Sequence, residues 1–215
     1  MRLPDPPFLL VTDRRQARRP LPDVIAQALA AGCPWVSLRE KDLSDDDQVV
    51  LARTLLPLTR RHGATLTLHG EAALAKACAA DGAHLPAGSD AIGARALLGR
   101  DKLIGISIHT VTDAEELDPT SVDYAVAGPA YETASKPGYG PEIGRLGLAA
   151  ITAATRVPIL AIGGINTARV AEVLAAGAVG VAVMGGVMRA AAPEQEVRAL
   201  LATVAASSAA TAKLV

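Results

Sequence analysis

The chain has 215 residues, of which 50% are hydrophobic and only 2% aromatic, and its formal net charge at pH 7 is -1. This length suits a single domain with a sizeable core, while the balanced charge and the scarcity of aromatic rings argue against binding to nucleic acid or to acidic membranes. The longest early apolar run, Phe8–Val11, is too short for a signal peptide or a membrane span, so we expect a cytoplasmic protein that acts on a small molecule.

Short apolar segments alternate with longer amphipathic ones along the whole chain. The apolar segments predict strands at Phe8–Thr12, Trp35–Arg39, Thr65–Leu68, Gly82–Leu85, Leu103–Ser107, Tyr124–Ala127, Ile159–Ile162 and Gly180–Met184. The stretches between them predict helices at Leu21–Ala31, Ser44–His62, Glu71–Ala80, Ala91–Gly99, Val111–Leu117, Leu146–Thr155, Thr167–Ala176 and Glu194–Ala206. Eight such units of roughly 25 residues fit an α/β fold with a closed parallel sheet, the (β/α)8 TIM barrel. We expect one domain over residues 1–215, with a frayed tail from about residue 205.

Three similar phrases recur where a predicted helix gives way to the next strand. They are Ala30–Cys33, Ala80–Ala83 and Ala175–Ala178, each with glycine in the third position. Because glycine readily adopts the left-handed conformation that ends many helices, each phrase predicts a glycine cap followed by a strand.

Two glycine pairs near the C-terminus indicate the class of ligand. Gly163-Gly164 follows the seventh predicted strand, and Gly185-Gly186 follows the eighth. Glycine lets the backbone approach a bulky anion, and the loops after strands 7 and 8 of such barrels often hold a phosphate group. The pairs therefore predict a phosphorylated ligand.

Polar side chains follow several other predicted strands. Arg39 and Lys41 come just after the second strand, where they suit a phosphate, although a charged triplet there also fits a solvated loop. The long irregular stretch 128–144 follows the sixth strand. Because active sites of these barrels lie where the strands end, we expect such groups to converge on a pyrophosphate or a doubly phosphorylated ligand. They are Arg39, Lys41, Ser107, Thr133, Ser135 and Lys136.

Histidine and aspartate residues supply the other candidates. His69 follows the third strand, where it could transfer protons near neutral pH, although a loop histidine without a role fits equally. His84 lies in an apolar strand, which favours a buried, hydrogen-bonded side chain. Asp90 is well explained as a helix N-cap, and no paired carboxylates mark a metal site.

These residues resemble the thiamine phosphate synthase family and its close relatives, the thiazole tautomerases (TenI-like proteins). The matching phrases span nearly the whole chain in the expected order: LVTD at 10–13, LREKD at 38–42, ADGAHL at 80–85, GISIHT at 105–110, GP at 128–129, TASK at 133–136, AIGGI at 161–165 and GVAVM at 180–184. The resemblance implies a TIM barrel that binds a thiazole phosphate, whose phosphate would be held by Gly163, Gly164, Gly185 and Gly186.

In a synthase of this family, an aminopyrimidine pyrophosphate binds as well. Its pyrophosphate leaves with the help of Mg2+, and the thiazole nitrogen attacks the resulting cation. The resemblance implies that Thr133 lies in the loop between the two substrates. It also implies contacts to the pyrophosphate from Arg39, Lys41, Ser107 and Lys136.

Several positions depart from the family pattern. His69-Gly70 stands where a synthase ends strand 3 with Asn-Asp, the Asp being a magnesium ligand. Ser37 replaces a Gln, and the second metal-binding Asp corresponds either to Ser89 or, after a shift of one residue, to Asp90. Pro129 occupies the place of the catalytic histidine of the tautomerases.

Our main hypothesis is a thiazole tautomerase, which makes the thiazole ring aromatic by a proton shift and needs no cofactor. His69 would move the proton, while Arg39, Lys41 and Lys136 hold the substrate's carboxylate or close the loop, so His69 and Lys136 are the catalytic candidates. The alternative is a thiamine phosphate synthase with its Mg2+ site rebuilt around Asp90. A third hypothesis is a non-catalytic protein that binds or senses a phosphorylated ligand. A homodimer is the default for such enzymes.

Overall fold

The fold is a closed barrel of parallel strands. The computed structural model describes residues 3–133, 135 and 141–211. Its strands are β1 (Phe8–Val11), β2 (Trp35–Leu38), β3 (Thr65–His69), β4 (Gly82–Leu85), β5 (Leu103–Ile108), β6 (Tyr124–Ala127), β7 (Ile159–Ile162) and β8 (Gly180–Val183). Each strand pairs with the next, and β8 pairs with β1, where Leu10 lies opposite Val183. The predicted single-domain (β/α)8 TIM barrel is confirmed.

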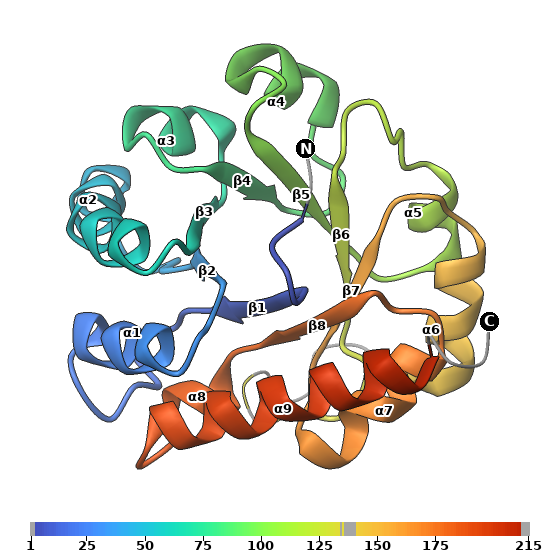
Figure 1. Cartoon of the computed structure of the whole chain (residues 1–215). Coiled ribbons are helices and arrows are strands. Elements are labelled where there is room, and N and C mark those ends of the chain that lie inside the picture. The colour runs from blue at the N-terminus through green and yellow to red at the C-terminus, as the bar shows by residue number, and fades with distance from the viewer. Residues whose placement is uncertain (1–2, 134, 136–140, 212–215) are drawn as a thin grey trace.

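Helices connect the strands and enclose the barrel (Figure 1). They are α1 (Leu21–Ala30), α2 (Asp45–Arg61), α3 (Ala72–Ala77), α4 (Ala91–Leu98), α5 (Val111–Glu115), α6 (Gly144–Ala153), α7 (Thr167–Ala175), α8 (Gly185–Met188) and α9 (Pro193–Thr211). The sequence did not predict α8, a single turn that starts at the second glycine pair. This turn fixes the direction in which the chain leaves β8 and therefore shapes the carboxyl end of the barrel.

Strand side chains divide the core into two parts, because successive residues of a strand point to opposite faces. Those pointing outward pack against the helices in one large cluster. Those pointing inward form a smaller cluster, in which the rings of Trp35 and Tyr124 meet edge to face with centroids 4.6 Å apart. Leu3, from the amino-terminal segment, packs against this inner cluster. The barrel interior is thus filled next to the amino-terminal segment, and a cavity forms at the carboxyl ends of the strands.

Two of the three predicted glycine caps are confirmed, and one is wrong. Gly32 and Gly177 have φ angles of 95° and 94°, in the left-handed region. Gly82 instead begins β4, where an added Cβ would lie 2.8 Å from the Cβ of Leu103 on β5. The left-handed residue here is Ala79, just before that phrase, at φ 57°. The glycine at position 82 therefore serves the close approach of two strands, a tertiary reason that a local pattern does not reveal.

The C-terminal segment also differs from expectation. Helix α9 continues to Thr211, whereas the sequence predicted a frayed tail from about residue 205.

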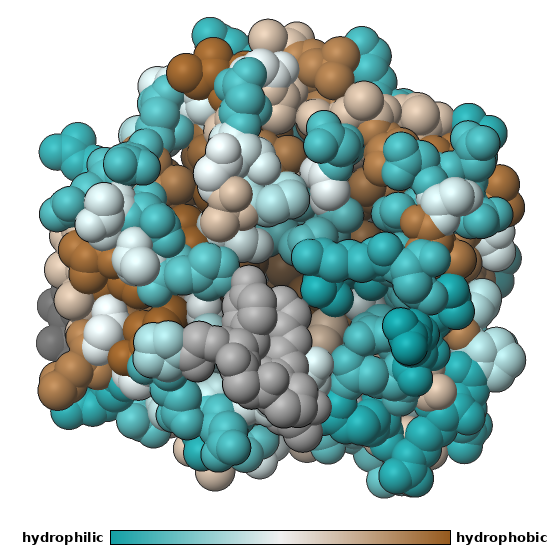
Figure 2. All heavy atoms as spheres, turned by 180° about the vertical axis from the view of Figure 1, so that it is seen from behind, coloured by the Kyte–Doolittle hydropathy of each residue, from teal (hydrophilic) through white to brown (hydrophobic). Residues whose placement is uncertain are grey.

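No helix in the described part of the chain is long and apolar enough to cross a membrane. On the face opposite to that of Figure 1, hydrophilic residues cover broad areas and hydrophobic ones form smaller patches (Figure 2).

Candidate active site

A cavity of about 390 Å³ opens where the strands end. Its wall is formed by the last residues of β3, β5, β7 and β8 and by the loops that follow them, the position typical of active sites in this fold. The predicted site residues that line it are Arg39, His69, Ser107, Thr133, Ser135, Gly163, Gly164, Gly185 and Gly186. Three others do not join this lining: Lys41 is exposed outside it, Asp90 lines a neighbouring cavity, and Lys136 lies outside the described residues.

The loop after β6 partly explains why residues 163 and 164 are glycines. Gly163 and Gly164 have φ angles of 100° and 64°. A Cβ on Gly163 would lie 2.8 Å from the Cα of Pro129, and one on Gly164 would lie 2.6 Å from the carbonyl oxygen of Glu132. The Tyr131 N–H also donates to the Gly163 carbonyl at 3.1 Å. These glycines therefore let the loop after β6 pack closely on the end of β7, besides leaving main chain exposed to the cavity.

The two residues of the second glycine pair lie in different environments. A Cβ on Gly185 would collide with the side chains of Ser135 and Arg189. Gly186 is exposed, and the nearest atom to its hypothetical Cβ is a carboxylate oxygen of Glu196 at 3.9 Å. Gly185 is thus covered by polar side chains, whereas Gly186 leaves the start of α8 open.

A chain of buried polar groups forms the opposite side of the cavity. The two ring nitrogens of His84 lie 3.2 Å from the Tyr124 hydroxyl and 3.0 Å from the Ser107 hydroxyl. The His69 ring stacks on that of His84 with centroids 4.9 Å apart. Burial, assisted by the positive charge of Arg39, lowers the pKa of His84 to about 3. His84 is therefore a neutral hydrogen-bonding group, as expected for a buried strand histidine.

The backbone that carries Arg39 is fixed by the loop after β1. The Thr12 hydroxyl accepts from the Arg39 N–H at 2.9 Å and donates to the Glu40 carboxylate at 2.7 Å. Glu40 is only 2% exposed and also accepts from the Arg14 N–H. Burial raises the pKa of Glu40, and these donors oppose the rise. The result is that Arg39 enters the cavity while Lys41, two residues on, points elsewhere.

Two cations in the cavity wall were not predicted from the sequence. Arg169 donates to the Gly164 carbonyl at 3.2 Å and lies over the Tyr131 ring, 4.2 Å from its centroid. Arg189 follows α8 and lies against Gly185. A usable signal existed: Arg169 and Arg189 stand five and three residues beyond the two glycine pairs, about one helical turn away.

The carboxylates near the strand ends do not fit a Mg2+ site. Gly70 provides no ligand at the end of β3, and its φ of 143° would strain an aspartate there. The Asp90 carboxylate caps α4, accepting from the Gly93 N–H at 2.8 Å, and it lines the cavity of about 340 Å³ next to Gly70. In the described ranges, no group of three or more His, Cys, Asp or Glu residues could hold a metal ion. The structure gives no support to Asp90 as a metal ligand in the main cavity.

The sequence and fold match those of known proteins. A family model described as thiamine monophosphate synthase matches residues 8–187. The chain belongs to this family. It is 41% identical over 202 residues to a thiamine-phosphate synthase of a Roseiflexus species, which covers 92% of the chain and 85% of the relative. For the thiamine-phosphate synthase of Chlorobium luteolum, the identity is 36% over 207 residues, covering 94% of the chain and 95% of the relative.

Solved structures agree with this assignment. A thiamine phosphate pyrophosphorylase of Pyrococcus furiosus superposes with a TM-score of 0.82 at 28% identity, covering 93% of the chain and 96% of that protein. A 3-hexulose-6-phosphate synthase, at a TM-score of 0.68 and 18% identity over 91% of the chain and 98% of that protein, shares the fold. The chain is therefore an enzyme of thiamine biosynthesis and a transferase. The comparisons favour the synthase alternative, and they do not support our main hypothesis of a thiazole tautomerase.

Proposed function

We propose that the chain is a thiamine-phosphate synthase that joins an aminopyrimidine pyrophosphate to a thiazole phosphate. The main support is the family match across nearly the whole barrel. The cavity is compatible with two anionic groups, because Arg39 lines one part of it and the glycine pairs with Arg169 and Arg189 line another. Under this proposal His69 is not an acid or base for a tautomerisation. It contributes a ring face, together with His84, to the wall between the anionic groups.

In this proposal the pyrophosphate binds beside Arg39 and Ser107. A guanidinium can donate two parallel hydrogen bonds to phosphate oxygens, and it needs no deprotonation at any step. The C–O bond to pyrophosphate breaks, the electron pair leaves with the pyrophosphate, and the thiazole nitrogen forms the new C–N bond. Arg39 stabilises the charge that builds up on the leaving group. We propose that Thr133 and Ser135, which line the cavity, contact the substrates, as does Lys136, which lies outside the described residues.

The Ser107 hydroxyl is oriented by the buried polar chain. We assign the Tyr124 hydroxyl as donor to Nδ1 of neutral His84, which leaves the His84 Nε2–H to donate to Ser107 Oγ. The Ser107 proton is then directed to an acceptor in the cavity, such as a pyrophosphate oxygen. Since the described carboxylates do not form a Mg2+ site, we derive no step through that ion.

Product formation tests the proposal directly. Purified protein is incubated with both substrates, with and without Mg2+, and thiamine phosphate is measured. We expect product in the presence of both substrates. Arg39→Ala should lower kcat/KM by about a hundredfold, because charge-assisted hydrogen bonds to the leaving group are lost.

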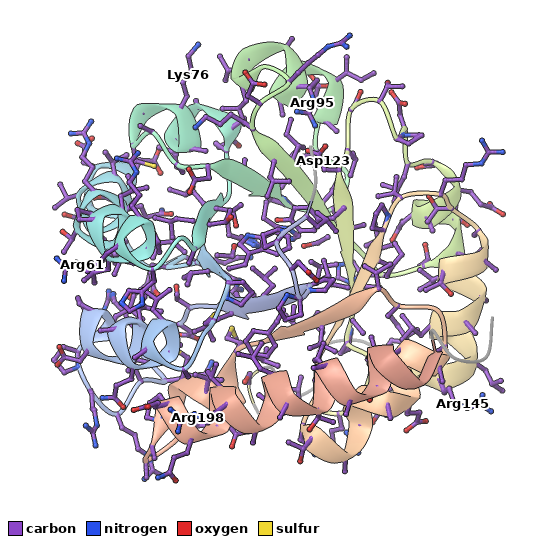
Figure 3. All side chains as sticks on the ribbon, in the orientation of Figure 1. Arg61, Lys76, Arg95, Asp123, Arg145 and Arg198 are labelled. Atoms are coloured by element: carbon purple, nitrogen blue, oxygen red, sulfur yellow. The ribbon has the colours of Figure 1, made fainter. Side chains whose placement is uncertain are left out.

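Arg61→Ala is the matched control, because this arginine is exposed at the end of α2 on the outside of the barrel (Figure 3). Its kcat/KM should stay within about twofold of the wild type. Binding of both substrates without thiamine phosphate formation under any condition would contradict the proposal. Conversion of a carboxylated thiazole phosphate in place of synthesis would contradict it as well.

A further inference from the structure

Arg189 is a cation in the cavity wall whose role the resemblance does not define. It follows the last residue of α8, and its guanidinium lies directly against Gly185. The side chain is half-buried and lines the cavity together with Ser135 and both glycines of the second pair. A positive charge is therefore placed beside main chain that carries no side chain of its own.

Neutral groups hold this guanidinium. Its Nη1 donates to the Gln16 side-chain oxygen and, at 3.1 Å, to the Ser135 hydroxyl. Ser135 also donates to Gln16 at 3.1 Å, and the Gln16 amide donates to the Asp13 carboxylate at 2.5 Å. The three residues come from the loop after β1, the loop after β6 and the end of α8. They meet only because the barrel is closed.

The lack of a counter-ion distinguishes Arg189 from arginines with a structural role. Arg95 lies 2.6 Å from the Asp123 carboxylate, and the two side chains lie close together in Figure 3. Arg198 pairs with Glu194 at 2.5 Å along α9. Over residues 3–133, 135 and 141–211, Arg189 has no carboxylate partner within ion-pair distance. Its charge is therefore available to an anion in the cavity.

The donor geometry allows such an anion to bind without breaking the existing contacts. A guanidinium has five N–H donors, and both hydrogen bonds of Arg189 within the described residues use Nη1. Nη2 and Nε remain for a ligand, and together they match the spacing of two phosphate oxygens. Ser135 can stay bound to Arg189 while the ligand binds.

We propose that Arg189 binds the phosphate group of the thiazole substrate and that Ser135, to which Arg189 donates a hydrogen bond, lies beside this phosphate. Gln16 is a positioning residue, which holds the guanidinium in place from the loop after β1. This inference rests on the proposed function, since it names a residue that recognises one of its two substrates. It also predicts that recognition depends on the phosphate rather than on the thiazole ring.

Binding experiments test this separately from turnover. The affinity of wild type and Arg189→Ala is measured by calorimetry for thiazole phosphate and for the thiazole alcohol that lacks the phosphate. We expect Arg189→Ala to weaken the binding of thiazole phosphate by about tenfold to a hundredfold, and that of the alcohol by less than twofold. Arg189→Lys should lie between, because it keeps the charge and loses the paired donors.

Two further variants separate positioning from a general effect on stability. Gln16→Ala should weaken the binding of thiazole phosphate severalfold and leave the affinity for the alcohol unchanged, with little change in Tm. Arg198→Ala removes an exposed arginine of α9, and it should leave both affinities unchanged. An affinity of Arg189→Ala for thiazole phosphate within twofold of wild type, or an equal loss for the alcohol, would overturn the inference.

The outcome also differs from that of the synthase assay. A protein that makes no thiamine phosphate, yet binds thiazole phosphate through Arg189, contradicts the proposed function and supports the phosphate contact. A protein that makes thiamine phosphate while Arg189→Ala binds normally supports the function and overturns the contact.

Discussion

The two sides of the cavity are built on different principles. On the side of β3 to β5, side chains on rigid strands hold each other through hydrogen bonds, as His84 does with Tyr124 and Ser107. On the side of β7 and β8, glycine main chain and loop residues such as Ser135 and Arg189 make the wall. Substitutions on the first side should act through lost or unpaired polar groups, and those on the second through collisions and altered backbone conformation.

At neutral pH the largest effect is expected at the first glycine pair. Gly163→Ala should lower the free energy of unfolding by about 2–4 kcal/mol, because the left-handed φ and the 2.8 Å approach to the Pro129 Cα both oppose a Cβ. Gly186→Ala is the matched control, since its Cβ would meet no atom closer than a Glu196 carboxylate oxygen at 3.9 Å and alanine is preferred in a helix. It should raise stability by about 0.5–1 kcal/mol. If urea unfolding showed equal losses of unfolding free energy for the two variants, the contrast between Gly163 and Gly186 would be wrong.

The next effect is a pH dependence on the strand side. Burial holds the pKa of His84 at about 3, below its ordinary value of 6.5, so unfolding takes up a proton between these values. The contribution of His84 to stability is complete above pH 6.5 and is progressively lost as the pH falls towards 3. His84→Gln should remove this slope from a plot of unfolding free energy against pH. His62→Gln, at the exposed end of α2, should retain it.

The smallest effect concerns two buried hydroxyls that face each other across β2 and β3. Ser37 and Thr67 are register partners and are both fully buried. The Ser37 hydroxyl has no hydrogen-bond partner within the described part of the chain, whereas Thr67 accepts from the Trp35 indole N–H at 3.2 Å. Without ligand, Ser37→Ala should raise the free energy of unfolding by about 1 kcal/mol, because an unpaired buried polar group is removed.

Thr67→Val provides the contrast for that variant. It leaves the Trp35 N–H without an acceptor, so we expect a loss of about 1–3 kcal/mol. Thermal unfolding of the two variants beside the wild type measures both signs. A loss of stability in Ser37→Ala would mean that the Ser37 hydroxyl has a hydrogen-bond partner in solution. The strand side of the cavity would then not be weakened by an unpaired hydroxyl.

Local signals made the barrel and the glycine pairs predictable. Apolar runs mark strands, and β1 to β8 start at or very near the residues expected. The reaction followed less directly. Gly70 stands where a synthase has a magnesium-binding aspartate and so favoured the tautomerase, although Pro129 stands where a tautomerase has its catalytic histidine. The whole-chain identity to synthases carries more information than those two positions.

Contacts that depend on closure of the barrel were beyond the sequence. Gln16, Ser135 and Arg189 are separated by more than fifty residues, and no periodicity connects them. A helix of four residues such as α8 has too few positions to show an amphipathic pattern. Arg39 and Lys41 look equivalent in the sequence, and only the contacts of Thr12 and Glu40 show which of them enters the cavity.

The ring pair inside the barrel offers an optical consequence. Trp35 is the single tryptophan of the chain, and it is shielded from solvent beside Tyr124, whose hydroxyl reaches Ser107 through His84. Its ultraviolet emission should therefore be shifted to short wavelengths in the native protein. A ligand that hydrogen-bonds to Ser107 should alter the Trp35 emission through His84 and Tyr124. Ligand binding could then be followed by the protein's own fluorescence, without an added dye.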